Sequence, residues 1–150
     1  MRRIEVRERT PELIQQLLKV WEESVKATHL FLSSDEIEDI KEYVPHAIRD
    51  IRDLVMIENE GDEPVAFMGV ENERLEMLFV APGQRGNGLG KCLLLYGMEH
   101  YGVRTLTVNE QNPQAKGFYE HMGFHVYKRT DYDEQGNVYP LFYMSCEERI

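Results

Sequence analysis

The sequence predicts a single α/β domain, residues 1–150, with a mixed and mostly antiparallel sheet. Three observations lead to this prediction. A chain of 150 residues has the length of one domain, because domains commonly contain about 100–200 residues. Segments with apolar residues at helical spacing are interspersed with short segments of strand-forming residues. No linker rich in proline, glycine or serine divides the chain.

The first third of the chain is expected to form one strand and two helices. A short strand covers residues 4–7, and Thr10 then has the character of an N-cap with proline directly after it. Apolar residues at helical spacing extend this first helix to about Ala27. A capping-box pattern at residues 33–36 opens a second helix, which Pro45 should break or kink.

Three strands with short turns between them follow the second helix: residues 54–58, 65–70 and 75–80. Such short connections imply an antiparallel meander. A glycine-rich loop then leads into a third helix at about residues 89–101. The remaining elements are a strand, a helix and two strands: residues 105–108, 113–122, 124–129 and 141–145. The prediction is therefore about seven strands and four helices in the order β-α-α-β-β-β-α-β-α-β-β.

The charge and the cysteine content exclude several classes of protein. The formal net charge is −10, so we expect no nucleic-acid and no membrane partner, because phosphate groups repel an acidic chain. Acidity favours cationic substrates such as amines, or it simply keeps the chain soluble. Cys92 and Cys146 lack CxxC spacing and no HExxH occurs, which predicts reduced thiols and no metal. No apolar run reaches 18 residues and no signal-peptide core is present, so the expected location is cytoplasmic.

The glycine-rich loop is the most informative segment. A strand ends at Val80 and a helix begins near Gly88, so the amides of the loop lie at a helix N-terminus. Unpaired N–H groups and the helix dipole both favour an anion there, although alternating glycines also occur in ordinary turns. Arg85 and Lys91 add positive charge. A P-loop does not fit, because Arg85 and Cys92 stand where it requires glycine and serine or threonine. A dinucleotide fingerprint does not fit either, since its third glycine comes one place early.

Two motifs carry a resemblance to a known family. Residues 85–90 read RGNGLG and match the pyrophosphate-loop pattern [QR]-x-x-G-x-[GA]. Residues 112–124 match a second pattern, N-x-x-A-x-x-F-Y-x-x-x-G-F. The two motifs follow one another in the order and at the separation that the family shows. The chain therefore resembles the GNAT superfamily of acyl-CoA-dependent N-acyltransferases over nearly its whole length. Residues 27–32 and 136–141 further resemble a bacterial branch of small acetyltransferases, some of which act on protein lysines.

The resemblance implies a cofactor site between the fourth and fifth strands. These strands should splay apart, so that the pantetheine arm of acetyl-CoA pairs with the backbone of the fourth strand and the Val80 amide polarises the thioester carbonyl. The residues expected to bind the cofactor through this strand and the loop are Leu78, Phe79, Val80, Arg85, Gly86, Asn87, Gly88, Leu89, Gly90 and Lys91. The side chains of Asn109 and Asn112 either hold the pantetheine arm or form a turn and a helix cap.

The reaction requires few side chains. Tyr119 matches the family tyrosine that donates a proton to the departing sulfur, and packing beside Phe118 is its other interpretation. Glu76 lies two and four residues before Leu78 and Val80, so the three should share a strand face. Glu76 is then the candidate base toward the amine through water, as in some relatives, or else a solvent-facing strand residue.

The acceptor side is less determined by the sequence. His29 ends the first helix, where it either binds or deprotonates the acceptor or stabilises the helix dipole. Phe31, Tyr132 and Tyr139 are expected to line the acceptor cleft or to pack near turns.

These features predict an acetyl-CoA-dependent N-acetyltransferase that transfers the acetyl group directly to a primary amine in a ternary complex. No cysteine matches a nucleophile position of the family, which disfavours an acyl-enzyme. The alternative is an acyl-CoA-binding domain that regulates or scaffolds without turnover, and Tyr119 favours the enzyme. The acceptor stays open among a protein lysine, a protein N-terminus, a polyamine and an antibiotic amine, and the chain is expected to be a monomer or a homodimer.

Overall fold

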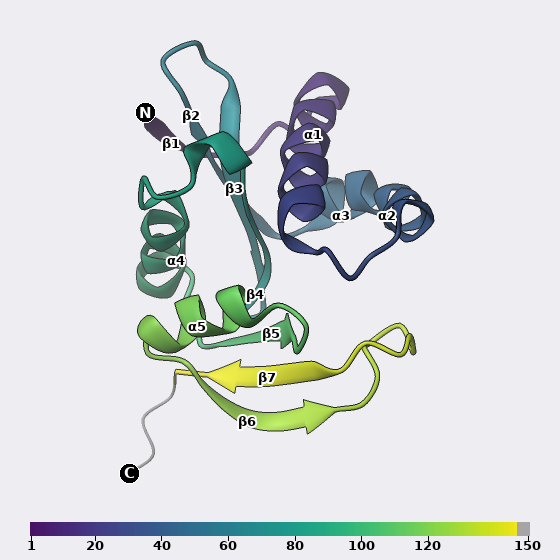
Figure 1. Cartoon of the computed structure of the whole chain (residues 1–150). Helices are drawn as coiled ribbons and strands as arrows, with labels where there is room; N and C mark the ends of the chain where they lie inside the picture. The colour runs from purple at the N-terminus through teal and green to yellow at the C-terminus, as the bar shows by residue number, and fades with distance from the viewer. Residues whose placement is uncertain (147–150) are drawn as a thin grey trace.

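A seven-stranded mixed sheet with helices on both faces forms the frame of the molecule (Figure 1). The computed structural model describes residues 1–146. The strands are β1 (Arg2–Glu5), β2 (Asp53–Glu58), β3 (Pro64–Glu71), β4 (Arg74–Val80), β5 (Thr105–Asn109), β6 (His125–Thr130) and β7 (Leu141–Ser145). Their spatial order is β1-β2-β3-β4-β5-β7-β6. Only the β4–β5 neighbours among these strands run parallel, which confirms the mixed and mostly antiparallel sheet.

The helices confirm the predicted element order. They are α1 (Pro11–Thr28), α2 (Ser34–Lys41), α3 (Val44–Asp50), α4 (Leu89–His100) and α5 (Pro113–His121), with a 3₁₀ turn, η1 (Pro82–Gln84), after β4. Thr10 and Ser33 cap α1 and α2 as predicted, and Ser33 forms the complete capping box with Glu36. The expected break at Pro45 divides the second helix into α2 and α3, with the proline in the first turn of α3, where its missing N–H costs nothing.

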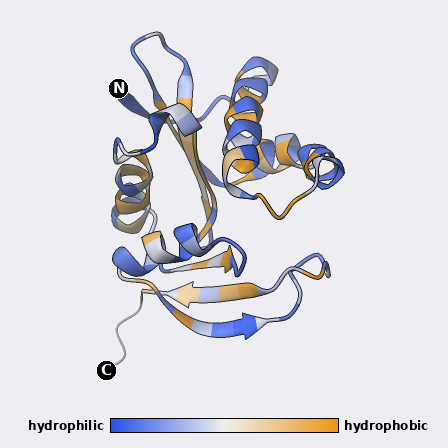
Figure 2. Cartoon of the chain, in the orientation of Figure 1, coloured by the Kyte–Doolittle hydropathy of each residue, from blue (hydrophilic) through white to orange (hydrophobic). Residues whose placement is uncertain are grey.

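Two apolar cores lie on the two faces of the sheet. One includes Leu93 and Leu94 of α4 together with Leu106 of β5, and the other includes Leu17 of α1 and Phe67 of β3. Figure 2 shows the central strands as hydrophobic and the outer surfaces of the helices as largely hydrophilic. The helices α1, α2 and α3 therefore cover one face, and α4 and α5 cover the other (Figure 1). No helix within the described residues is both long and apolar enough to cross a membrane.

The sheet splays between β4 and β5. The two strands pair at Arg74–Thr105 and at Leu75–Leu106, both near their starting ends, and Figure 1 shows them diverging beyond these pairs. The later part of β4 is then a strand edge that faces β5 without pairing to it in residues 1–146. This arrangement confirms the predicted separation of the fourth and fifth strands.

A β-bulge interrupts β4 at Glu76. Opposite it on β3, Gly69 pairs with Met77 and Val70 pairs with Leu75, so Glu76 is the extra residue on its strand. Leu75 and Leu78 consequently belong to the same core, although they stand three positions apart. The period of two does not continue through a bulge, and the shared face predicted for Glu76, Leu78 and Val80 does not follow from their spacing.

Candidate active site

A cavity of about 810 Å³ opens at the splayed end of the sheet. Its walls come from the end of β4, the loop and first turn of α4, the C-terminal end of α1, and α5. The predicted cofactor residues that line it are Leu78, Phe79, Val80, Arg85, Gly86, Gly88, Leu89, Gly90, Lys91, Asn112 and Tyr119. His29 of the predicted acceptor set lines it as well. The structure thus brings together most of the residues of the two sequence motifs.

The loop before α4 presents backbone donors to this cavity. Gly88 is the N-cap of α4, adopts φ +74°, and provides no side-chain cap for the first turn. Gly86 also has a positive φ, of +84°. A Cβ added to Gly90 would lie 3.7 Å from Phe118 and 3.9 Å from Val80, within the wall of the cavity. With Arg85 exposed beside it, this uncapped N-terminus fits a phosphate anion.

The edge of β4 directs one amide into the splay. The Ala81 N–H donates to the Val65 carbonyl of β3 at 2.8 Å. Successive residues of an antiparallel ladder point their amides in opposite directions, so the Val80 N–H points away from β3 and toward β5. An N–H fixed in this way is suited to hold a carbonyl oxygen that gains negative charge.

Tyr119 stands on α5 at the wall of the cavity. Asn112 caps this helix by accepting the Ala115 N–H at 3.2 Å, and Tyr119 packs with ring centroids 5.2 Å from Phe118 and 6.2 Å from Phe124. Its hydroxyl makes no hydrogen bond to any residue in 1–146. Burial raises the pKa of Tyr119 far above its ordinary value, so the hydroxyl stays protonated and available as a donor.

His29 closes the C-terminal end of α1 over the same cavity. Its N–H donates to the Val25 carbonyl at 2.8 Å, and its Nδ1 lies 2.8 Å from the Thr28 hydroxyl oxygen. Burial, with a smaller effect of the Arg85 charge, lowers the pKa of His29. A lowered pKa disfavours the charged ring that would stabilise the helix dipole, and the position of His29 in the cavity wall leaves a contact with a ligand open to it.

The other predicted acceptor residues lie outside the residues that line the cavity. The Phe31 ring packs at a tilt against His29 and Tyr139, at centroid distances of 5.4 and 5.6 Å, and the Tyr139 hydroxyl donates to Glu36 at the start of α2. This contact joins the α1–α2 connection to the β6–β7 loop, residues 131–140. Tyr132 is exposed, and its carbonyl accepts a hydrogen bond from the hydroxyl of Thr130 at the end of β6.

Asn87 and Asn109 make local contacts instead of lining the cavity. The Asn87 amide donates to Gln84 at 3.1 Å, and Asn109 accepts the Gln111 N–H at 2.9 Å in a turn. The turn interpretation left open for Asn109 is the one that its side chain adopts.

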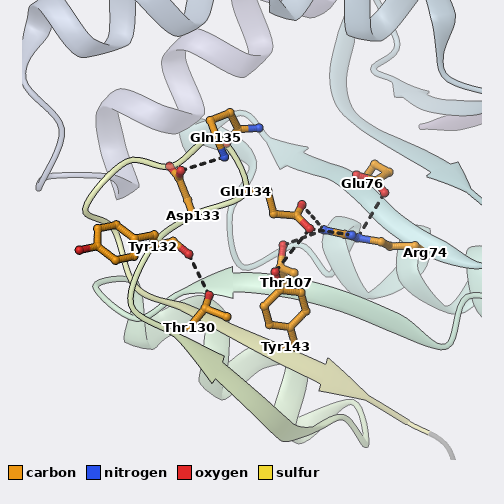
Figure 3. Close-up of polar contacts among 9 residues, drawn as sticks. All are labelled: Arg74, Glu76, Thr107, Thr130, Tyr132, Asp133, Glu134, Gln135 and Tyr143. Atoms are coloured by element: carbon orange, nitrogen blue, oxygen red, sulfur yellow. Dashed lines mark hydrogen bonds and ion pairs between the residues drawn. The ribbon is translucent and has the colours of Figure 1, made fainter.

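Glu76 also lies outside the cavity lining. Its carboxylate is 3.2 Å from the Nε of Arg74, and Arg74 in turn binds Glu134 of the β6–β7 loop (Figure 3). Desolvation raises the pKa of Glu76, partly offset by Arg74, and the charges of Glu134 and Glu71 raise it further. A raised pKa suits a carboxylate that must accept a proton.

Several residues that line the cavity were not among the predicted site residues: Ser24, Thr28, Gln84, Gln114, Ala115, Phe118 and His121. Ala115 and Phe118 belong to the second motif, which already marked them. Ser24 and Thr28 are four apart on α1 and so lie on one face, a spacing visible in the sequence only once that face is known to point at the cavity. Nothing local to Gln114 or His121 distinguishes them from surface residues of α5.

The cysteines contribute no nucleophile to the cavity. Cys92 lies on α4 and packs against the core, and the Cys146 thiol is 3.8 Å from the Val103 carbonyl. Among the described residues, no group of three or more histidine, cysteine, aspartate or glutamate side chains is arranged to hold a metal.

Comparisons with known proteins identify the family of the chain. The family model described as an acetyltransferase (GNAT) domain matches residues 15–146. A peptidyl-lysine N-acetyltransferase, YjaB, of Salmonella typhimurium is 38% identical over 92% of this chain and 94% of its own length. The solution structure of apo YjaB from Escherichia coli has a TM-score of 0.86 and 34% identity, covering 99% of this chain and 100% of that one. A PaiA N-acetyltransferase of Thermoplasma acidophilum, solved with coenzyme A, shares the fold at a TM-score of 0.70, with 22% identity, 99% of this chain and 100% of that one covered.

The splayed β4–β5 pair lies beside an uncapped, glycine-rich helix N-terminus. Together with the family match, this geometry defines the protein as an acetyl-CoA-dependent N-acetyltransferase. The chain belongs to the GNAT acetyltransferase family.

Proposed function

We propose that the protein acetylates the ε-amine of lysine side chains in peptides or proteins, by direct attack of the amine on acetyl-CoA. The observation that carries this choice of acceptor is the 38% identity, over nearly the full chain, to a relative named a peptidyl-lysine N-acetyltransferase. The net charge of −10 supports it, because an acidic surface attracts a cationic side chain.

Acetyl-CoA would bind along the splay in this proposal. The free edge of β4 would pair with the pantetheine arm, and the amides from Gly86 to Lys91 would hold the pyrophosphate. The Val80 N–H would then stabilise the negative charge that develops on the thioester oxygen.

Proton transfer is assigned to two side chains. Tyr119 would donate its proton to the departing CoA sulfur, for which its raised pKa keeps it protonated. Glu76 would take the proton of the attacking amine through water, because it lies outside the cavity lining and cannot be assigned a direct contact. Neither cysteine lines the cavity, and this supports direct transfer without an acyl-enzyme.

Thiol release from acetyl-CoA tests the proposed function across a panel of amines: lysine peptides with blocked N-termini, peptides with free N-termini and no lysine, polyamines and aminoglycosides. We expect the highest kcat/KM with blocked lysine peptides, and mass spectrometry should locate the acetyl group on Nζ. Acetyl-CoA binding without thiol release from any amine would instead indicate a regulatory domain. A preference for a small amine would overturn the choice of protein lysine.

Glu76→Gln should lower turnover most at acidic to neutral pH. There the acceptor amine is protonated and needs a base, whereas at alkaline pH more of it is already neutral. The measurement is the pH dependence of kcat/KM for a lysine peptide, with Glu73→Gln, a carboxylate of the β3–β4 turn outside the cavity, as the matched control. A profile of unchanged height and shape would make Glu76 a solvated strand residue and move the search for a base to His29.

A further inference from the structure

We propose that Arg74 and Glu134 form a positioning pair, which fixes the β6–β7 loop relative to Glu76 on the acceptor side of the splay. The proposal rests on the proposed function, because Glu76 has a reaction to serve only if the chain acetylates an amine. Arg74 and Glu134 do not line the cavity, so neither is assigned a contact with acetyl-CoA.

The pair joins segments that are 60 residues apart in the chain. Arg74 donates through Nη2 to Glu134 Oε1 at 2.6 Å and through Nη1 to Glu134 Oε2 at 3.2 Å, a two-bond fork. Its Nη2 also lies within 3.4 Å of the Thr107 hydroxyl oxygen on β5. The Tyr143 hydroxyl on β7 supports Glu134 from the other side at 3.5 Å (Figure 3). One guanidinium therefore connects β4, β5 and the β6–β7 loop at the closed end of the splay.

The same guanidinium holds the bulged residue of β4. Its Nε is buried and 3.2 Å from Glu76 Oε1, an ion pair without hydrogen-bond geometry. The bulge leaves Glu76 opposite no residue of β3, so the ladder does not constrain it as it does its neighbours. Arg74 is the group that ties this side chain in place.

The β6–β7 loop has a second attachment at its far end. There Tyr139 contacts Phe31 and donates to Glu36, which fastens the loop to the α1–α2 connection. Two attachments, one to the sheet and one to α2, therefore hold the two ends of the loop. Loss of the Arg74–Glu134 attachment should loosen one end of the loop and leave the acetyl-CoA cavity intact.

The charges around Glu76 give the pair a signature that a purely structural ion pair lacks. The groups that face Glu76 are Arg74 on its own strand, Glu134 on the β6–β7 loop and Glu71 on β3. Arg74 lowers the pKa of Glu76, whereas Glu134 and Glu71 raise it. Removing the two members of the pair should therefore move this pKa in opposite directions.

The experiment compares Arg74→Met with Glu134→Gln. We expect Arg74→Met to move the acid limb of kcat/KM to higher pH by about one unit, as the loss of a nearby opposite charge implies, and Glu134→Gln to move it to lower pH. The KM for the lysine peptide should rise about tenfold in Arg74→Met, the loss expected for one charge-assisted hydrogen bond, with the KM for acetyl-CoA unchanged. Arg74→Lys keeps the charge but cannot form the two-bond fork. This variant should return the acid limb of kcat/KM to its original pH, whereas the KM for the lysine peptide should stay raised.

The neighbouring ion pair provides matched controls. Arg104 and Glu73 lie 2.8 Å apart at the β3–β4 turn, and Arg104→Met and Glu73→Gln remove the same groups without touching Glu76 or the β6–β7 loop. In these controls, the acid limb of kcat/KM and the KM values for the lysine peptide and for acetyl-CoA should be the same as in the parent chain. Shifts of the same sign in Arg74→Met and Glu134→Gln, or shifts no larger than in the controls, would overturn the positioning pair.

A titration of the free protein separates this proposal from the proposed function. The carboxyl resonance of Glu76, assigned with Glu76→Gln in a chain labelled with ¹³C-glutamate, reports the pKa without any substrate. Opposite shifts in the two variants would support the pair even in a chain that acetylated no lysine peptide, and that failure would then count against the proposed function alone. A resonance that does not respond to either variant would contradict the pair.

Discussion

Gly88→Asp should raise the Kd for acetyl-CoA at least about 100-fold, since juxtaposing like charges costs several kcal/mol and each 1.4 kcal/mol is a factor of ten. Gly88 begins α4 at φ +74°, and a Cβ built on it meets no atom within 4 Å. An aspartate side chain would therefore enter open space over the loop and place its charge where the proposal puts the pyrophosphate. Calorimetry with acetyl-CoA measures the effect.

Gly88→Asn is the matched control for this substitution. Asparagine has the same shape and tolerates a positive φ about as well as aspartate, so both variants carry the same backbone strain of about 1–3 kcal/mol. The difference between the two affinities isolates the charge. If both variants bound acetyl-CoA as tightly as the parent chain does, the glycine loop would not be part of the cofactor site.

Tyr119→Phe should lower kcat by about 10²–10⁴-fold, the usual contribution of general acid catalysis. The ring contacts with Phe118 and Phe124 involve no hydroxyl and should persist, so the KM for acetyl-CoA should stay near its original value. Because burial raises the pKa of Tyr119, the hydroxyl is protonated through neutral and mildly alkaline pH, and the loss should be present throughout that range. Steady-state kinetics with a saturating lysine peptide measure it.

Tyr127→Phe controls for the loss of a tyrosine hydroxyl as such, because Tyr127 is exposed on β6 and does not line the cavity. A fall in kcat of less than about threefold in Tyr119→Phe would be well short of the range expected for general acid catalysis. The CoA thiolate would then leave without a proton donor, and Tyr119 would be a packing residue. A joint loss of acetyl-CoA binding and rate would instead assign it a structural role.

Local signals were sufficient for the elements of the fold. The capping residues Thr10 and Ser33, the apolar spacing along α1, and the glycines before α4 each act within a few residues of chain, and each was placed correctly. The first strand was predicted at residues 4–7 and lies at Arg2–Glu5. The prediction was two residues off, because so short a strand has too few residues to define its ends by pattern. That residues 1–150 form one domain stays a prediction.

Long-range pairing was beyond these signals. The insertion of β7 between β5 and β6 depends on contacts between whole strands, and no periodicity encodes it. The bulge at Glu76 adds one residue to β4 relative to β3, so the shared face predicted for Glu76, Leu78 and Val80 no longer follows from their spacing. The Arg74–Glu134 pair likewise joins two residues whose local sequence gives no sign of the other.

The site residues divide in the same way. Except for Asn87, those within the two motifs line the cavity because the motifs describe backbone shape around the loop and α5, and their chemical roles stay predictions. Phe31, Tyr132 and Tyr139 were chosen as aromatic residues near turns, and only the packing of Phe31 with Tyr139 and of Phe31 with His29 connects them to the cavity.

The splay has a thermodynamic consequence for the free protein. The strands β1–β4 and the strands β5, β7 and β6 form two half-sheets, joined by two register pairs between β4 and β5 and by the apolar core that contains Leu75 of β4 and Leu106 of β5. Any ligand that bridges the junction contributes RT ln(1 + [L]/Kd) to the free energy of unfolding, which is about 2.7 kcal/mol at a ligand concentration of 100 Kd. If acetyl-CoA binds across the junction as proposed, it stabilises the contact between the halves, and the free energy of unfolding of this chain should rise with the concentration of its own substrate.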